Sequence, residues 1–124
     1  MSIQIGDKIP ASTLNILKDG VQAVNTDEVF KGRKVVLFSV PGAFTPTCSA
    51  KHLPGYVEKL GEFKARGIDV ACMAVNDAFV MSAWGKQQNV PEELHMLADG
   101  NGAFADAMGL KFDASAFGMG NRAK

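Results

Sequence analysis

The sequence predicts an α/β fold in which buried strands alternate with helices, and three observations support this. Two apolar runs, Val35–Val40 and residues 68–75, are short, nearly continuous and rich in β-branched residues, as is typical of strands buried on both faces. The segment between them repeats apolar residues every three to four positions, which is the spacing of an amphipathic helix. A further short strand is expected at Leu94–Ala98. The alternation favours a parallel sheet with crossover helices.

The N-terminal part predicts small antiparallel elements. Residues 3–5 are expected to form a short strand. Residues 14–17 and 21–24 are expected to form a hairpin, because the Lys-Asp-Gly at 18–20 has turn chemistry. Residues 26–30 then predict a one-turn helix with Thr26 as its N-cap and Gly32 after its end. The order of elements is that of a thioredoxin-like fold with an N-terminal β-hairpin extension.

The first long helix is predicted to begin near Cys48 and to end at Gly67. Its apolar stripe consists of Leu53, Tyr56 or Val57, Leu60 and Phe63. Pro54 interrupts this helix, because proline removes an interior hydrogen bond. We therefore expect the first turn, which carries Cys48, to be separated from the rest and able to unwind locally.

Two more helices follow in the predicted order. One is capped by Asn76 or Asp77 and fades near residues 88–89, and the other spans residues 101–108 and stops at Gly109. The inward residues predicted for them are Phe79, Val80, Ala83 and Trp84 in the first, and Phe104 and Met108 in the second. By spacing, Phe44, Phe79, Trp84 and Phe117 are core candidates. Without repeats or linkers, residues 1–124 are expected to form a single domain.

The amino-acid composition excludes some classes of function for this protein. The 124 residues carry 13 basic and 13 acidic side chains, so the formal net charge is zero, which argues against an electrostatic nucleic-acid or membrane surface. No apolar run approaches the length of a membrane span, and residues 1–10 lack the features of a secretory signal. A cytoplasmic protein with two reduced cysteines is the resulting expectation.

Cys48 is the strongest candidate for chemistry. The strand before it stops at Pro41 and Gly42, and a helix is expected to begin at the cysteine itself. Unpaired amides and the positive dipole end of a helix stabilise a thiolate, so Cys48 is predicted to be a nucleophile. Thr45 would add a hydroxyl donor to the thiolate or to a substrate oxygen, and Pro41 would shield the sulfur from water. The alternative is a small buried core cysteine.

The other candidate side chains are weaker. Cys72 lies in the middle of an apolar strand, so a core position is favoured over a role as resolving cysteine. His52 lies one helical turn after Cys48, where it either orients the site or is an ordinary surface histidine. His95 is expected to be structural. The spacing of histidines and cysteines does not suit a metal, and no nucleotide-binding motif is present, so no cofactor is predicted.

Several motifs resemble those of one known family. Residues 41–49 read PGAFTPTCS and residues 52–56 read HLPGY, which is similar to the active-site segment of the peroxiredoxins, in the peroxiredoxin-5 or plant type II subgroup. The likeness continues through VNDAFV at 75–80, WG at 84–85, LAD at 97–99 and GAF at 102–104. The resemblance covers the whole chain and implies a thioredoxin-like fold.

The resemblance also implies an activity and partners. Cys48 would reduce hydrogen peroxide or alkyl hydroperoxides and become a sulfenic acid, which an external thiol (glutathione, a glutaredoxin or a thioredoxin) would recycle. Thr45 would polarise the peroxide, Pro41 would screen the thiolate, and His52 and Phe44 are possible supporting residues. A homodimer is implied, with contacts from the loop at residues 43–44 and the helix start at residues 76–77.

Two alternative functions compete with this interpretation of the residues. One is a non-enzymatic thioredoxin-like redox-sensing or binding module, in which Cys48 is oxidised slowly and signals to a partner. The other is a cysteine hydrolase, which would need a Cys-His-Asn or Cys-His-Asp constellation that the sequence does not support. The rate of Cys48 oxidation separates an enzyme from a sensor.

The resemblance implies that the domain is C-terminally incomplete. A thioredoxin-like domain normally closes with two further strands and a helix, which we expect beyond Lys124. In the family an arginine that binds the thiolate and the peroxide lies at the start of the next strand. Arg122 lies before that position, so the resemblance assigns it no role. The resolving cysteine that some relatives carry near the C-terminus would also lie beyond Lys124.

Overall fold

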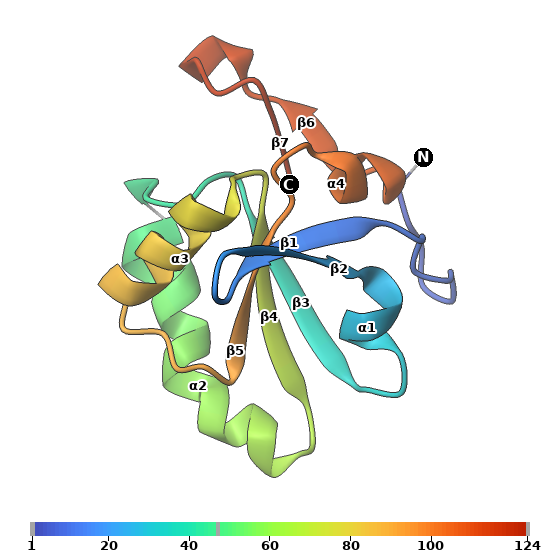
Figure 1. Cartoon of the computed structure of the whole chain (residues 1–124), viewed down its shortest axis with the longest axis vertical. Coiled ribbons are helices and arrows are strands. Elements are labelled where there is room, and N and C mark those ends of the chain that lie inside the picture. The colour runs from blue at the N-terminus through green and yellow to red at the C-terminus, as the bar shows by residue number, and fades with distance from the viewer. Residues whose placement is uncertain (1, 47, 124) are drawn as a thin grey trace.

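The computed structural model describes residues 2–46 and 48–123, except for the side chain of Cys48. Its centre is a five-stranded sheet in the order β2-β1-β5-β4-β3 (Figure 1). Three strands are parallel, β3 (Val35–Val40), β4 (Asp69–Ala74) and β5 (Leu94–Ala98). The hairpin of β1 (Thr13–Leu17) and β2 (Val21–Asn25) adds to β5 in antiparallel orientation. The predicted α/β fold with an N-terminal hairpin is confirmed.

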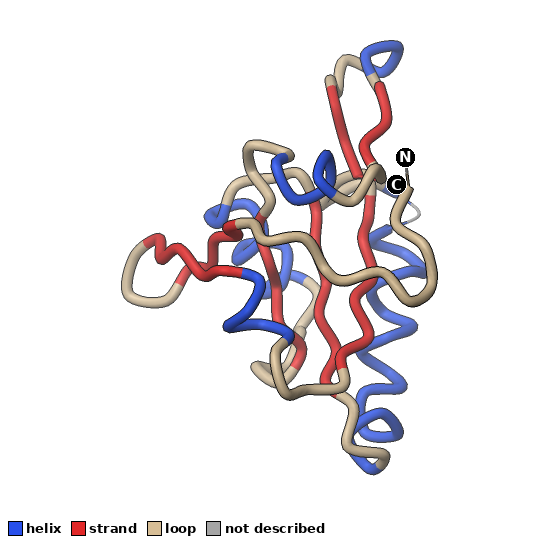
Figure 2. Tube along the Cα trace, turned by 90° about the vertical axis from the view of Figure 1, so that its right-hand side faces the viewer, coloured by secondary structure: helices blue, strands red, loops and turns tan. Residues whose placement is uncertain are grey.

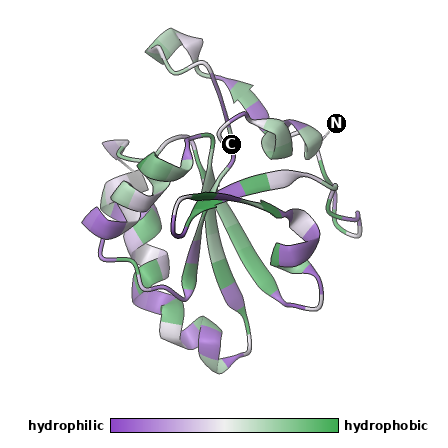
Figure 3. Ribbon diagram, viewed as in Figure 1, coloured by the Kyte–Doolittle hydropathy of each residue, from purple (hydrophilic) through white to green (hydrophobic). Residues whose placement is uncertain are grey.

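Helices cover both faces of the sheet, which explains the continuous apolar strands. On one face, α2 (Leu53–Ala65) and α3 (Ala78–Gln87) pack on Val70, Cys72 and Ala74. On the other face, α1 (Thr26–Phe30) and α4 (Ala103–Ala107) cover Ala71 and Met73. Figure 2 shows the sheet from the side, with the long helix α2 along one face. Because side chains alternate along a strand, β4 must be apolar at nearly every position (Figure 3).

The helix after Cys48 is divided as expected. A π-helical stretch, η1 (Cys48–His52), comes first, and α2 begins at Leu53 with Pro54 in its first turn. Leu53 and Leu60 are buried, and Tyr56, Val57 and Phe63 pack against the same core. Pro54 has no amide hydrogen, so it is tolerated where α2 begins but cannot continue the hydrogen bonds of η1. The turn that carries Cys48 is therefore a separate unit.

Two N-terminal predictions were wrong. Residues 3–5 form no strand, because Gly6 adopts a φ of 93° and Asp7 Oδ2 accepts a bond from Gln4 N, which turns the chain there. The N-cap of α1 is Asn25, whose Oδ1 accepts from Glu28 N at 2.9 Å. Thr26 is buried instead, and its hydroxyl donates to Pro10 O at 3.0 Å.

The core assignments were correct for Trp84, Phe104 and Met108, which are buried. They were wrong for Phe44, Phe79 and Phe117, whose exposed fractions are 48%, 63% and 80%. The inward face of α3 is turned relative to the prediction, and its buried residues are Ala78, Met81, Trp84 and Gly85. Asp77 is the N-cap of α3, as one of the two predicted caps. Three large aromatic side chains are thus left at the surface.

A small hairpin at the C-terminal side was not predicted. It pairs β6 (Lys111–Asp113) with β7 (Asn121–Ala123) as a separate two-stranded sheet, and a 3-10 turn, η2 (Ser115–Phe117), joins them. In Figure 1 this hairpin projects beyond the end of the main sheet. Three-residue strands are too short to show periodicity. Strands and a helix beyond Lys124, and a single domain over residues 1–124, stay predictions.

Candidate active site

The loop after β3 holds the motif residues in a tight turn. Gly42 is buried, and its carbonyl accepts from Thr45 Oγ1 at 2.7 Å. Phe44 has a φ of 65°, which is uncommon for a residue with a Cβ atom. Such backbone strain costs on the order of 1–3 kcal/mol and clusters at functional sites. The hydroxyl proton of Thr45 points to Gly42 O in this conformation, so donation to a substrate requires the hydroxyl to rotate.

Cys48 lies where the sequence predicted it, at the start of a helical segment that follows the end of β3. It is the first residue of η1, and Ser49 N donates to Thr45 O at 2.9 Å, which starts the helical hydrogen bonding. The side chain of Cys48 and the whole of Thr47 lie outside the described residues. The backbone nonetheless places Cys48 at a junction between a strand and a helical segment.

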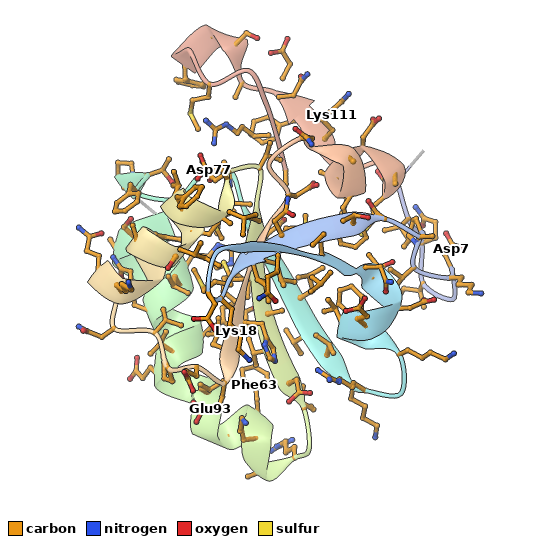
Figure 4. All side chains as sticks on the ribbon, viewed as in Figure 1. Asp7, Lys18, Phe63, Asp77, Glu93 and Lys111 are labelled. Atoms are coloured by element: carbon orange, nitrogen blue, oxygen red, sulfur yellow. The ribbon has the colours of Figure 1, made fainter. Side chains whose placement is uncertain are left out.

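Of the two residues that follow Val75 after β4, Asn76 braces this loop and Asp77 caps α3. Asn76 Oδ1 accepts from Ala43 N at 3.0 Å, and Asp77 Oδ1 accepts from Val80 N at 2.8 Å as the cap of α3. Asp77 lies at the end of α3 nearest the loop, far from Phe63 and Glu93 at the opposite end of the molecule (Figure 4). The carboxyl ends of β3 and β4 therefore meet at the candidate site, as neighbouring parallel strands require.

The turn that follows Cys48 is tied to α3 by a side-chain hydrogen bond. The indole Nε1 of Trp84 donates to Ser49 Oγ at 3.0 Å. Trp84 is fully buried, and a buried indole N–H needs an acceptor. Ser49, the residue next to Cys48, provides that acceptor.

Arg122 reaches the same end of the sheet from β7. Its Nε donates to Met119 O at 2.9 Å, and its Nη1 donates to Val75 O at 3.1 Å. A Cβ atom placed on Gly42 would lie 3.2 Å from Nη1, so the guanidinium is packed against the loop of the motif. The sequence assigned no role to Arg122, and the structure places it beside the candidate site.

His52 lies in an aromatic cluster. The centre of its ring is 5.0 Å from that of Phe38 and 5.8 Å from that of Tyr56, and the rings of Phe38 and Tyr56 stack at 4.0 Å. Lys51 and Lys59 join His52 and Tyr56 around an open hollow of about 330 Å³ on α2. His52 is therefore partly buried against Phe38 and Tyr56, and its role at the site stays a prediction.

Other candidates lie elsewhere. Cys72 is fully buried in β4, as the core interpretation predicted. His95 is in β5 and lines a hollow of about 500 Å³ between β5, α3 and the β1–β2 turn, away from the loop at residues 41–46. Within the described ranges, no group of three His, Cys, Asp or Glu side chains could hold a metal ion.

Sequence reasoning missed Asn76 as a brace of the loop, the Ser49–Trp84 pair and Arg122. Each acts through a partner far away in the sequence, so no local pattern marks it. One weak signal was present for Asn76, because polar residues that directly follow a buried strand lie at the edge where sites form.

Comparisons with known proteins agree with this geometry. Residues 4–123 match the family model named Redoxin. The chain is 51% identical to Peroxiredoxin-2E, chloroplastic, of Arabidopsis thaliana over 90% of this chain and 50% of that protein. It is 42% identical to Peroxiredoxin-2B of the same plant over 98% of this chain and 77% of that protein. The crystal structure of reduced Prx3 in complex with H2O2 from Vibrio vulnificus superposes with a TM-score of 0.93 at 50% identity, covering 98% of this chain and 77% of that one.

The fold and the strand-to-helix cysteine thus define a redoxin. The chain belongs to the peroxiredoxin family, in the type II or peroxiredoxin-5-like subgroup. It spans half the length of the chloroplast relative and about three-quarters of Peroxiredoxin-2B. In the part of the chain that the structure describes, no helix has the length and apolar character needed to cross a membrane.

Proposed function

We propose that this chain is a thiol-dependent peroxidase in which Cys48 is the reacting residue. The observation that carries the proposal is the position of Cys48 at the first residue of η1, directly after the loop that holds Pro41 and Thr45. Family membership supports the same reaction, and the Vibrio relative was solved with H2O2.

The first step oxidises the cysteine. The Cys48 thiolate attacks one peroxide oxygen, so an S–O bond forms as the O–O bond breaks. Sulfur loses two electrons and becomes a sulfenic acid, and the leaving hydroxide or alkoxide takes a proton to give water or an alcohol. Backbone amides at the start of η1 stabilise the developing negative charge, and Thr45 orients the peroxide by its hydroxyl. Pro41 keeps water from the thiolate, with Phe44 and His52 in support.

Recycling requires thiols from outside the chain. A first thiol condenses with the sulfenic acid and releases water, and a second thiol attacks the mixed disulfide and returns Cys48 to its thiol. Cys72 does not suit the role of internal partner, because it is fully buried in the middle of β4. Glutathione, a glutaredoxin or a thioredoxin is therefore the proposed reductant.

A homodimer and a reducing compartment belong to the same proposal. Phe44 and Phe79 are exposed, and the hydrogen bond from Ala43 N to Asn76 Oδ1 joins the segments that carry them. A second copy of the chain would cover these aromatic rings. Two cysteines in a small domain are more typical of reduced thiols than of a structural disulfide, which suits the cytoplasm or another reducing compartment.

The test is peroxide consumption with each reductant in turn. Purified chain is mixed with hydrogen peroxide or tert-butyl hydroperoxide and with glutathione alone, glutathione plus a glutaredoxin, or a thioredoxin system. We expect catalytic turnover with at least one reductant and none in Cys48→Ser. Slow, partial oxidation without turnover under every condition would favour the sensing module instead.

A further inference from the structure

The segment that must move during the proposed cycle is held by one specific contact. Ser49 lies in η1, and its Oγ accepts the hydrogen bond from Trp84 Nε1 at 3.0 Å. Trp84 is fully buried in α3, and its core cluster includes Leu53 at the start of α2. The contact therefore joins the turn that carries Cys48 to the buried core.

The backbone of η1 is weakly supported at its C-terminal end. Pro54 has no amide hydrogen to donate back to the preceding turn, and π-helical geometry is itself a rare local distortion that occurs mostly at functional sites. Leu53, by contrast, is fully buried and fixes the start of α2. Opening of the Cys48 turn is expected to stop at Leu53.

We propose that the Ser49–Trp84 hydrogen bond is the latch that sets how often the Cys48 turn opens. This inference rests on the proposed peroxidase cycle. Peroxide reacts with the closed turn, in which the amides at the start of η1 are in place, whereas an external thiol needs the open turn to reach the sulfenic acid. Ser49 and Trp84 are positioning residues, because their hydrogen bond sets the balance between the closed turn that reacts with peroxide and the open turn that reacts with the thiol.

The physical basis is the fate of the indole N–H. With the turn closed and Ser49 replaced by Ala, the N–H is buried without an acceptor, which is unfavourable. With the turn open, water reaches the N–H in both proteins. Removing the hydroxyl therefore destabilises only the closed state, and we expect the open population to rise by about 5- to 150-fold.

The test uses the full chain in its reduced form and without peroxide. Hydrogen–deuterium exchange of the peptide spanning η1 is compared in the wild type, Ser49→Ala, Ser49→Thr and the control Ser82→Ala. Ser82 is a partly buried serine on α3 that lines a different hollow. We expect faster exchange in Ser49→Ala within the range above, recovery in Ser49→Thr, and wild-type exchange in Ser82→Ala.

A second variant, Trp84→Phe, tests the proposal even if Ser49→Ala changes the packing around η1. In Trp84→Phe the donor is already absent, so adding Ser49→Ala should change exchange by less than about twofold if the two residues act as a pair. Unchanged exchange in Ser49→Ala, equal loosening in Ser82→Ala, or independent effects in the double variant would each overturn the latch.

The rates of the two steps of the cycle distinguish this role from a merely structural one. In Ser49→Ala the rate of peroxide attack should fall while the rate at which glutathione reacts with preformed sulfenic acid should rise. A parallel fall of both rates would contradict the proposed division. Because exchange is measured without peroxide, an inactive wild type with the expected exchange pattern would refute the peroxidase proposal and leave the latch intact.

Discussion

Arg122 packs against Gly42, the second residue of the loop that leads to Cys48. A Cβ atom at Gly42 would lie 3.2 Å from Arg122 Nη1 and 3.2 Å from Thr45 Cγ2. The same guanidinium donates to Val75 O, directly after the end of β4. The contact joins the β6–β7 hairpin to the carboxyl ends of two parallel strands, and it makes the loop geometry depend on a residue far along the chain.

Replacing Arg122 by Met should loosen the candidate site. The carbonyls of Val75 and Met119 lose their donors, and such losses typically cost about 1–3 kcal/mol in the free energy of unfolding. We also expect slower alkylation of Cys48, because the loop before it loses a support. Urea unfolding and iodoacetamide kinetics measure the two effects. Arg122→Lys is the informative control, and equal stability of all three proteins would show that Arg122 is not a brace.

Gly42 should tolerate Ala poorly. The added methyl group would contact the guanidinium, Thr45 Cγ2 and Met119 Cε at 3.2–3.3 Å, so these side chains must shift by a few tenths of an ångström. Overpacking of this kind costs about 1–3 kcal/mol. Gly61→Ala is the matched control, since a Cβ atom there meets nothing within 4 Å and lies in the middle of α2. Equal or higher stability of Gly42→Ala would show that the loop has spare room.

Thr45→Val should raise the pKa of the Cys48 thiol or slow its reaction. Valine has nearly the same shape but cannot donate to Gly42 O, a bond of 2.7 Å that holds the loop. A raised pKa leaves less thiolate at neutral pH, so alkylation would slow and its pH profile would move to higher pH. The profile is measured in a Cys72→Ser background, and Thr45→Ser should restore it. Identical alkylation profiles for Thr45→Val and for the protein that keeps Thr45 would show that Thr45 has no part in the proposed mechanism.

Asp99 should stabilise the fold without affecting Cys48. It is buried and accepts from Phe104 N at 3.1 Å and from Ala105 N at 2.8 Å, the amides that begin α4. Asp99→Ala leaves both amides without this partner, and we expect a loss of about 2–4 kcal/mol in thermal or urea unfolding. The control is Asp106→Ala, which breaks a surface ion pair with Lys111 and should cost less than about 1 kcal/mol. Similar losses in both variants would contradict this account.

Local sequence patterns were enough to predict most of the fold. Buried strands such as β3 and β4 are recognisable because burial on both faces forces continuous apolar residues, and Pro54 marks the break between η1 and α2 through its missing amide. Caps were less certain. Asn25 and Thr26 both have side chains that can cap a helix, and Thr26 is instead engaged in a partly buried hydrogen bond to Pro10 O.

Only the part of the candidate site that lies within one segment of the sequence was predictable. Pro41, Thr45 and Cys48 lie within one segment, so spacing alone brings them together. The braces act across long separations, since Ala43 and Asn76 are 33 positions apart in the sequence and Val75 and Arg122 are 47 positions apart. Such pairs depend on the order of strands in the sheet, which no single segment encodes. The exposed Phe79 is a related case, because the face that α3 buries is set by its packing on β5 and β1.

The central claim is that Cys48 is an activated nucleophile for peroxide, and trapping of its oxidised form tests this most directly. Reduced wild type, Cys48→Ser and Cys72→Ser are each treated briefly with one equivalent of hydrogen peroxide and then incubated with excess dimedone, and the adduct is located by mass spectrometry. The account predicts nearly stoichiometric labelling of Cys48 in the wild type and in Cys72→Ser, and none in Cys48→Ser. Labelling confined to Cys72, or Cys48 left unlabelled, would contradict it.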